Sequence, residues 1–284
     1  MLGARRSLIP DIKPKDNRNM MKIKISLVIV LVVSCLSLGV GLVLGEDSDE
    51  TDYKVVKVLV YSGIDTSDIS IEQVKKCMDQ SNLENMTPGV KFVYDTSKVI
   101  NNKTLSGYDV LIMAGSETGV HYIYNDDVDT VALKSFVASG KGFIGICAGA
   151  YSAANYTAYW DNGWGLAPSI INLPFLEKGN VTIQATSEGT GIIGKDVRMI
   201  SHINGPAMNI SGYGAVAFAT YTDSNSKYNG YAAIIGDHYG EGRIVLSGVH
   251  PELSPQQAEL LAKLIMWSYN GSYVKDATSL NTGD

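Results

Sequence analysis

The chain has 284 residues, of which 45% are hydrophobic, and a formal net charge of −6 at pH 7. This apolar content is sufficient for a globular domain with a sizeable core. The mild negative charge and the lack of basic clusters exclude the usual basic surface for nucleic acids, so no nucleic-acid partner is expected.

An apolar run near the N-terminus predicts a membrane segment. Residues 25–45 are almost entirely apolar, which is about the length that spans a bilayer. Basic residues precede the run and acidic residues follow it, which predicts a cytoplasmic N-terminus and an extracytoplasmic domain. We favour an uncleaved anchor because the run is long for a signal peptide, while cleavage as a secretory signal would leave the domain secreted.

This run divides the chain into five parts. We expect a basic segment at residues 1–24, the anchor or signal at 25–45 and an acidic linker at 46–54. Residues 1–19 are interpreted as a possible extension upstream of a start at Met20 or Met21. One globular domain is expected at 55–271, followed by a disordered tail at 272–284.

The first half of the globular domain alternates strands and helices. Apolar segments predict strands at Lys54–Tyr61, Val90–Tyr94, Tyr108–Met113 and Lys141–Ile146. Helical periodicity, with capping residues at Asp68–Glu72 and a stop at Gly140, predicts helices at Ile69–Gln80 and Asp126–Ser139. Such alternation is typical of a parallel sheet with helices on both faces.

From Val181 onward, strand patterns follow one another with few helices between them. The expected strands are Val181–Ala185, Gly214–Tyr221, Tyr231–Gly236 and Arg243–Ser247. They would extend the sheet, partly antiparallel, before a final helix at Pro255–Tyr269. The fold class predicted is therefore α/β.

A cysteine flanked by glycines follows the fourth strand. Gly145-Ile146-Cys147-Ala148-Gly149 leads from an apolar strand into small residues suited to a packed helix start. A strand that turns sharply into a helix strains the turn residue and lifts its side chain above the sheet. The glycines at −2 and +2 suit neighbouring backbone that leaves no room for Cβ atoms. By itself the motif fits a nucleophile or a small buried cysteine equally well.

A second motif favours the nucleophile. The last apolar strand ends in His250-Pro251-Glu252. A thiol nucleophile needs a base within hydrogen-bond reach, and the base needs a third group that fixes its tautomer. Because both motifs follow strands expected to be parallel, both should lie at the carboxyl edge of one sheet. The sequence thus predicts a triad of Cys147, His250 and Glu252.

Metals and disulfides are not expected. Only Cys77 and Cys147 lie in the predicted domain, which is too few for a disulfide framework. The four histidines show no spacing typical of metal ligands, so neither a metal nor a cofactor is predicted; they are His121, His202, His238 and His250.

These motifs resemble a known family. Gly-Ile-Cys-Ala-Gly-Ala-Tyr, the late Gly-Val-His-Pro-Glu and an early strand that ends in a glycine loop resemble class I glutamine amidotransferase-like domains, and most closely the biotin-protein ligase N-terminal domain family. The resemblance covers about residues 55–270. It implies a flavodoxin-like sheet and a Cys-His-Glu triad.

The resemblance also implies an oxyanion hole and a surrounding pocket. The backbone N–H of Ala148 and one from Gly115 or Ser116 would be its donors. The family usually has two adjacent glycines in that loop, and Ser116 departs from this pattern. Gly205-Pro206 matches a family loop that borders the site, and His121 and Tyr122 follow the oxyanion loop; both are also interpretable as ordinary loop residues.

The leading prediction is a membrane-anchored, extracytoplasmic cysteine hydrolase that acts on an amide or similar acyl bond of a small-molecule or peptide-like substrate. Two alternatives stay open. One is a ligand-binding or structural module that keeps the fold without turnover. The other is a partner-dependent glutaminase subunit, which would require a cytoplasmic domain.

Overall fold

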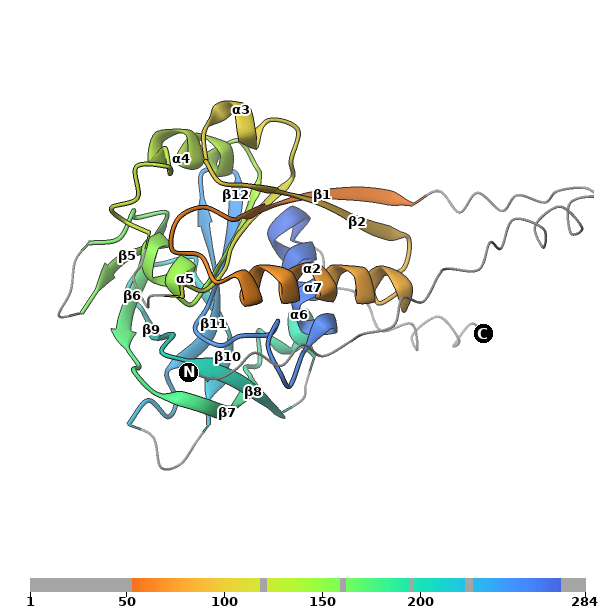
Figure 1. Ribbon diagram of the computed structural model, residues 1–284. Coiled ribbons are helices and arrows are strands. Elements are labelled where there is room, and N and C mark those ends of the chain that lie inside the picture. The colour runs from red at the N-terminus through yellow and green to blue at the C-terminus, as the bar shows by residue number, and fades with distance from the viewer. Residues whose placement is uncertain (1–52, 118–121, 159–161, 195–196, 223–226, 272–284) are drawn as a thin grey trace, which may run out of the picture. The chain divides into compact units, whose positions relative to one another are not determined.

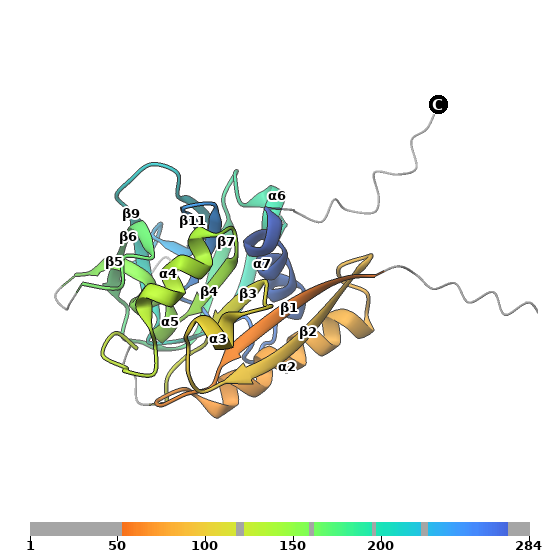
Figure 2. The ribbon, with the colours of Figure 1, turned by 90° about the horizontal axis from the view of Figure 1, so that it is seen from above.

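The computed structural model describes residues 53–117, 122–158, 162–194, 197–222 and 227–271. Twelve strands in these ranges belong to one sheet, whose main path runs β2-β1-β3-β4-β12-β11-β10-β7-β8. Figures 1 and 2 show this sheet with helices on both of its faces.

The first half of the main path is parallel. The strands β2 (Val90–Ser97), β1 (Lys54–Tyr61), β3 (Val110–Met113), β4 (Gly142–Ile146) and β12 (Gly242–Ser247) all run in the same direction. β3, β4 and most of β12 are fully buried, as expected for parallel strands covered on both faces. Their carboxyl ends therefore meet at one edge of the sheet.

The second half of the main path is antiparallel throughout, where the sequence predicts a partly antiparallel extension. It contains β11 (Ala232–Tyr239), β10 (Val216–Tyr221), β7 (Lys178–Ala185) and β8 (Val197–Ile203). Off the main path, β9 (Pro206–Ile210) pairs with β11 and with β6 (Ala167–Pro174), and β6 pairs with β5 (Ala154–Thr157).

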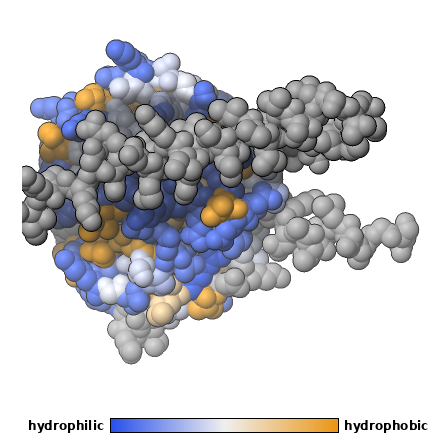
Figure 3. Space-filling view, turned by 45° about the vertical axis from the view of Figure 1, so that its right-hand side comes forward, coloured by the Kyte–Doolittle hydropathy of each residue, from blue (hydrophilic) through white to orange (hydrophobic). Residues whose placement is uncertain are grey.

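Helices cover both faces, which confirms that part of the predicted α/β class. One apolar cluster joins the sheet to α2 (Asp68–Leu83), α6 (Thr190–Ile193) and α7 (Ala258–Asn270). The other joins the opposite face to α3 (Asn102–Leu105), α4 (Thr130–Ala138) and α5 (Ala148–Ala153). On the face seen in Figure 3, hydrophilic surface is interrupted by separate apolar patches.

Several elements differ from the sequence expectation. Strands β5, β6, β8 and β9 carry no strand prediction, and the predicted loop at Gly205-Pro206 lies at the turn that joins β8 to β9. β11 continues through Asp237, His238 and Tyr239, beyond the strand expected at Tyr231–Gly236. The apolar residues of these short strands do not by themselves indicate a strand, because strand preference depends on packing against the neighbouring strands.

The predicted anchor at residues 25–45, like the rest of residues 1–52, lies outside the described residues, and so does the tail at 272–284. Within the described ranges, no helix has the length and apolar character needed to cross a bilayer.

Candidate active site

Cys147 lies at the turn between β4 and α5, at the carboxyl edge of the parallel strands. Its backbone has φ 52° and ψ −104°, a conformation that costs a non-glycine residue of order 1–3 kcal/mol. The turn is held on both sides, because the Cys147 N–H donates to the Ser247 carbonyl at 2.9 Å and the Cys147 carbonyl accepts from the Tyr151 N–H at 2.9 Å. This is the geometry expected of a nucleophile elbow.

The flanking glycines leave no space for a side chain. A Cβ on Gly145 would lie 2.6 Å from the Gly149 carbonyl carbon and oxygen, and one on Gly149 would lie 2.1 Å from the Met113 carbonyl oxygen. Both contacts are with backbone, which cannot move aside as a side chain can. The glycines at −2 and +2 are therefore required by packing, as the sequence suggests.

His250 and Glu252 follow β12, the neighbour of β4. The two residues meet through His250 Nδ1 and Glu252 Oε1, 2.8 Å apart. The His250 and Glu252 side chains are 4% and 0% exposed, so solvent does not compete for this bond. A carboxylate on Nδ1 fixes that nitrogen as the donor and leaves Nε2 as the acceptor.

His250 is also next to Cys147. A Cβ placed on Gly115 would be 3.0 Å from His250 Cε1 and 3.8 Å from Cys147 Cβ, so the two side chains flank the same glycine. Burial by itself would lower the pKa of the His250 imidazole, but Glu252 and Cys147 act against burial and raise it. A raised pKa favours the imidazolium, the form that stabilises a neighbouring thiolate.

Two further groups, which the sequence does not predict, form hydrogen bonds with Glu252 and Cys147. The Ser70 hydroxyl donates to Glu252 Oε1 at 2.6 Å, and the Cys147 thiol donates to the Ile203 carbonyl oxygen at 3.3 Å. The sequence places Ser70 in a helix start and Ile203 beside a loop, and neither residue has a local pattern that reveals its neighbour.

The loop after β3 carries the predicted oxyanion donors Gly115 and Ser116. The Gly115 N–H donates to Ser70 Oγ at 3.4 Å, so it faces α2. Hydrogen bonds on both sides of Ser116 pair it with Thr66 in an antiparallel bridge, a pattern that turns the Ser116 N–H away from Thr66.

Ser116 stands where the family usually has a second glycine. Among the described residues, the non-glycine positions with positive φ are Asp65, Asn85, Cys147 and Asn204. Ser116 does not belong to this group, so its Cβ causes no backbone strain. Ala148, the other predicted donor, is the first residue of α5 and directly follows the nucleophile.

Gly205 and Pro206 lie in and after the turn between β8 and β9, packed against the end of β12. A Cβ on Gly205 would be 2.0 Å from the Gly248 carbonyl oxygen, and the Pro206 carbonyl accepts a hydrogen bond from the Tyr221 hydroxyl at 3.0 Å. Both residues are buried. The structure therefore brings this turn to the site, next to the contact between Cys147 and Ile203.

Tyr122 is 1% exposed and supports the oxyanion loop from behind. Its hydroxyl lies 3.0 Å from the carbonyl oxygens of both Ala114 and Gly115. It thus holds the loop that carries the predicted donors. His121, the other residue predicted after this loop, lies outside the described residues.

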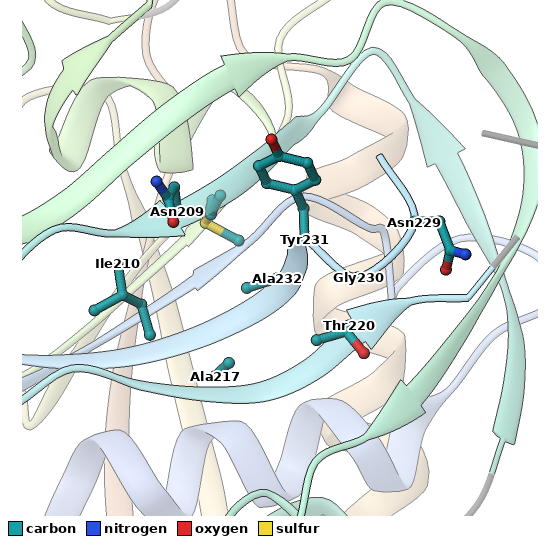
Figure 4. Close-up of a pocket in the computed structure, with 9 residues that line it drawn as sticks. Asn209, Ile210, Ala217, Thr220, Asn229, Gly230, Tyr231 and Ala232 are labelled. Atoms are coloured by element: carbon teal, nitrogen blue, oxygen red, sulfur yellow. The ribbon is translucent and has the colours of Figure 1, made fainter. Parts of the chain in front are cut away.

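A separate pocket of about 530 Å³ lies between β9, β10 and β11. Figure 4 shows the Tyr231 ring above Ala232, with Asn209 to one side and Asn229 to the other. Its walls offer amide and hydroxyl groups but no pairing of a nucleophile with a base, and none of the predicted site residues lines it.

Among the described residues, no group of three or more His, Cys, Asp or Glu side chains is arranged to hold a metal ion.

Comparison with known proteins identifies the same fold in solved structures. A glutamine amidotransferase superposes with a TM-score of 0.51 at 17% identity, covering 74% of this chain and 98% of that one. A ThuA-like protein from Bacteroides uniformis gives 0.50 at 14% identity, covering 75% and 91%. A cold-adapted β-galactosidase from Rahnella sp. R3 gives 0.52 at 13% identity, covering 74% of this chain but 30% of that one. These identities establish a shared fold and no shared activity.

No curated protein matches the chain. A family model described as "Biotin-protein ligase, N terminal" matches residues 56–164, which run from β1 through the elbow at Cys147. Residues 56–164 thus carry the pattern of the biotin-protein ligase N-terminal family on a fold shared with glutamine amidotransferases, as the sequence resemblance predicted.

Proposed function

We propose that the protein is a cysteine-dependent hydrolase of an amide or similar acyl bond, with Cys147 as nucleophile, His250 as general base and acid, and Glu252 as the residue that orients His250. The observation that carries this proposal is the buried His250–Glu252 pair at 2.8 Å, placed beside a cysteine held in a strained elbow. A buried pair of this kind sets the tautomer that a general base needs.

In the proposed reaction, the Cys147 thiol gives its proton to His250 Nε2 and the sulfur adds to the substrate carbonyl carbon. The N–H groups of Ala148 and Ser116 are the proposed donors to the resulting oxyanion. His250 then protonates the leaving amine as the C–N bond breaks, which leaves a thioester. Water gives a proton to His250, adds to the thioester and releases the acid and the free thiol.

Two features of the site support this sequence of steps. His250 lies beside Cys147, and its interaction with that side chain is one of the causes that raise the pKa of the imidazole, so His250 is placed to take the thiol proton. The thiol itself is partly exposed and donates to the Ile203 carbonyl. In the proposed complex, the substrate carbonyl group would approach the sulfur from the exposed side and replace its contact with the Ile203 carbonyl oxygen.

The membrane anchorage and extracytoplasmic location also remain part of the proposal, since they rest on the charge asymmetry around residues 25–45. Protease accessibility in intact cells tests them. Digestion of the domain in intact cells is expected, and digestion confined to lysed cells would contradict outward placement and favour the glutaminase-subunit alternative.

Alkylation of the full-length protein by iodoacetamide tests the nucleophile. Cys147 should react at neutral pH far faster than Cys77, which is 1% exposed and whose pKa is raised to about 12 by burial and by the charge of Glu252. Mass spectrometry resolves the two sites. A His250→Gln variant should slow the labelling of Cys147, whereas Cys77→Ala should not. Equal, slow labelling of both cysteines would contradict an activated nucleophile.

Turnover is tested with a panel of glutamine, peptide and cell-wall amides. Hydrolysis of one of these substrates that disappears in Cys147→Ser and is kept in Cys77→Ala supports the hydrolase. Rapid labelling of Cys147 without turnover of any member would favour the binding-module alternative.

A further inference from the structure

A buried serine from the opposite end of the domain sequence reaches the proposed triad. Ser70 lies in the first turn of α2 and is 2% exposed, while Glu252 is fully buried. Their hydrogen bond, from Ser70 Oγ to Glu252 Oε1 at 2.6 Å, joins residues that are 182 positions apart. Short bonds to an ionised carboxylate are among the stronger hydrogen bonds in proteins.

The Glu252 carboxylate depends on few partners. His250 Nδ1 and Ser70 Oγ both bind Oε1, and Oε2 is buried with no partner among the described residues. Among the described residues, Ser70 therefore supplies one of the two hydrogen bonds that orient this fully buried carboxylate. The other is the bond on which the tautomer of His250 depends.

The direction of the Ser70 hydroxyl is set by the oxyanion loop. The Gly115 N–H can only donate, so Ser70 Oγ accepts from it at 3.4 Å. A hydroxyl has one hydrogen, which Ser70 therefore gives to Glu252. Donors are thus arranged in one direction, from Gly115 to Ser70 and from Ser70 to Glu252, while His250 Nδ1 donates to the same oxygen.

We propose that Ser70 is a positioning residue, which holds the Glu252 carboxylate against His250 and links it to the loop of Gly115 and Ser116. This proposal rests on the proposed function of Cys147 and His250. Ser70 does not meet substrate; it acts by holding the Glu252 carboxylate in the orientation in which Oε1 accepts from His250 Nδ1. When this support is lost, the His250 imidazolium and hence the Cys147 thiolate are less stabilised.

The experiment is the pH dependence of iodoacetamide labelling at Cys147 in the full-length protein, from about pH 5 to about pH 9, the range in which a histidine-linked thiol changes charge. Ser70→Ala should move the half-maximal labelling rate to higher pH by about half a unit to one unit, which is about a three- to tenfold slower rate below the midpoint. Ser70→Thr keeps a hydroxyl and should restore most of the wild-type profile.

Ser81 provides the matched control. It lies on the same helix, is fully buried and its Oγ has no partner among the described residues, so Ser81→Ala should leave the profile unchanged. A Ser70→Ala profile that coincides with wild type, or one slowed equally at every pH without a shift, would overturn the positioning role. Wild-type Cys147 that labels no faster than Cys77 would instead overturn the proposed function, so the two failures are distinguishable.

Discussion

At the scale of single residues, the site depends on how closely backbone segments approach one another around Cys147. The strained turn is enclosed by β3, β4 and α5, and the glycines on either side touch main-chain atoms directly. The pattern Gly-x-Cys-x-Gly therefore predicts a tight turn from the sequence, because each glycine indicates a position where neighbouring backbone leaves no room for a Cβ. Ser70 differs, since nothing in its surrounding sequence indicates a carboxylate 182 positions away.

Gly149→Ala should destabilise the protein, because the added Cβ would lie 2.1 Å from the Met113 carbonyl oxygen. Forcing β3 and α5 apart is expected to lower the free energy of unfolding by about 1–3 kcal/mol or more, measured by urea denaturation. The matched control is Gly191→Ala in α6, where a Cβ meets no atom within 4 Å; it should be neutral or slightly stabilising. Equal stability of the two variants would contradict the packing argument.

At the scale of elements, the sequence predicts strands and helices well in the parallel half and less well at their ends. The helix expected at Asp126–Ser139 begins at Thr130, because Asp129 caps it by accepting from the Val131 and Ala132 N–H groups at 3.0 Å. Preceding residues form a turn in which the Val128 N–H donates to the Asn125 carbonyl. Hydrogen bonds of turns and caps decide where a helix begins, and the periodicity of apolar residues does not show these bonds.

Asp129→Ala should lower the free energy of unfolding by about 1 kcal/mol, since two N–H groups at the start of α4 lose their acceptor. Asp129→Asn keeps a side-chain oxygen at the cap and should retain most of the stability. Urea denaturation of both variants beside wild type gives the comparison, and a loss as large in the asparagine variant as in the alanine variant would show that the cap hydrogen bonds are not the cause.

At the scale of the whole molecule, the antiparallel half of the sheet turns back to cover the site. β8 and the turn to β9 bring Ser201, Ile203 and Gly205 against the residues that follow β4 and β12. His202 is fully buried, with the Glu177 carbonyl 3.0 Å from Nδ1 and the Gly205 carbonyl 3.1 Å from Nε2. Burial lowers the pKa of His202 to about 4, against the opposing effect of these two carbonyls.

This lowered pKa makes stability depend on pH. The unfolded chain takes up a proton on this histidine near pH 6.5, whereas the folded chain does so near pH 4. The contribution of neutral His202 is therefore fully present above about pH 6.5 and is lost as the pH falls through 4, by on the order of 3 kcal/mol in total.

Unfolding by urea at about pH 7 and about pH 4.5 measures this dependence. His202→Gln should lose less stability on acidification than wild type, even where its stability at neutral pH is lower. His238→Gln, which replaces an exposed histidine of β11, is the control for the substitution itself. An acid-induced loss in His202→Gln as large as in wild type would contradict the assignment.

The sequence by itself determined the alternation of strands and helices, the partly antiparallel second half, the elbow at Cys147 and the adjacency of His250 to Glu252. Each of these is a local pattern, in which residues within a few positions of one another satisfy a steric or hydrogen-bond requirement. Only the tertiary structure decided that Ser70 donates to Glu252, that the Gly115 N–H faces Ser70, and that the Ile203 carbonyl meets the thiol. Those contacts join segments far apart in the chain, and their geometry exists only once the strands have paired and α2 has packed on the sheet.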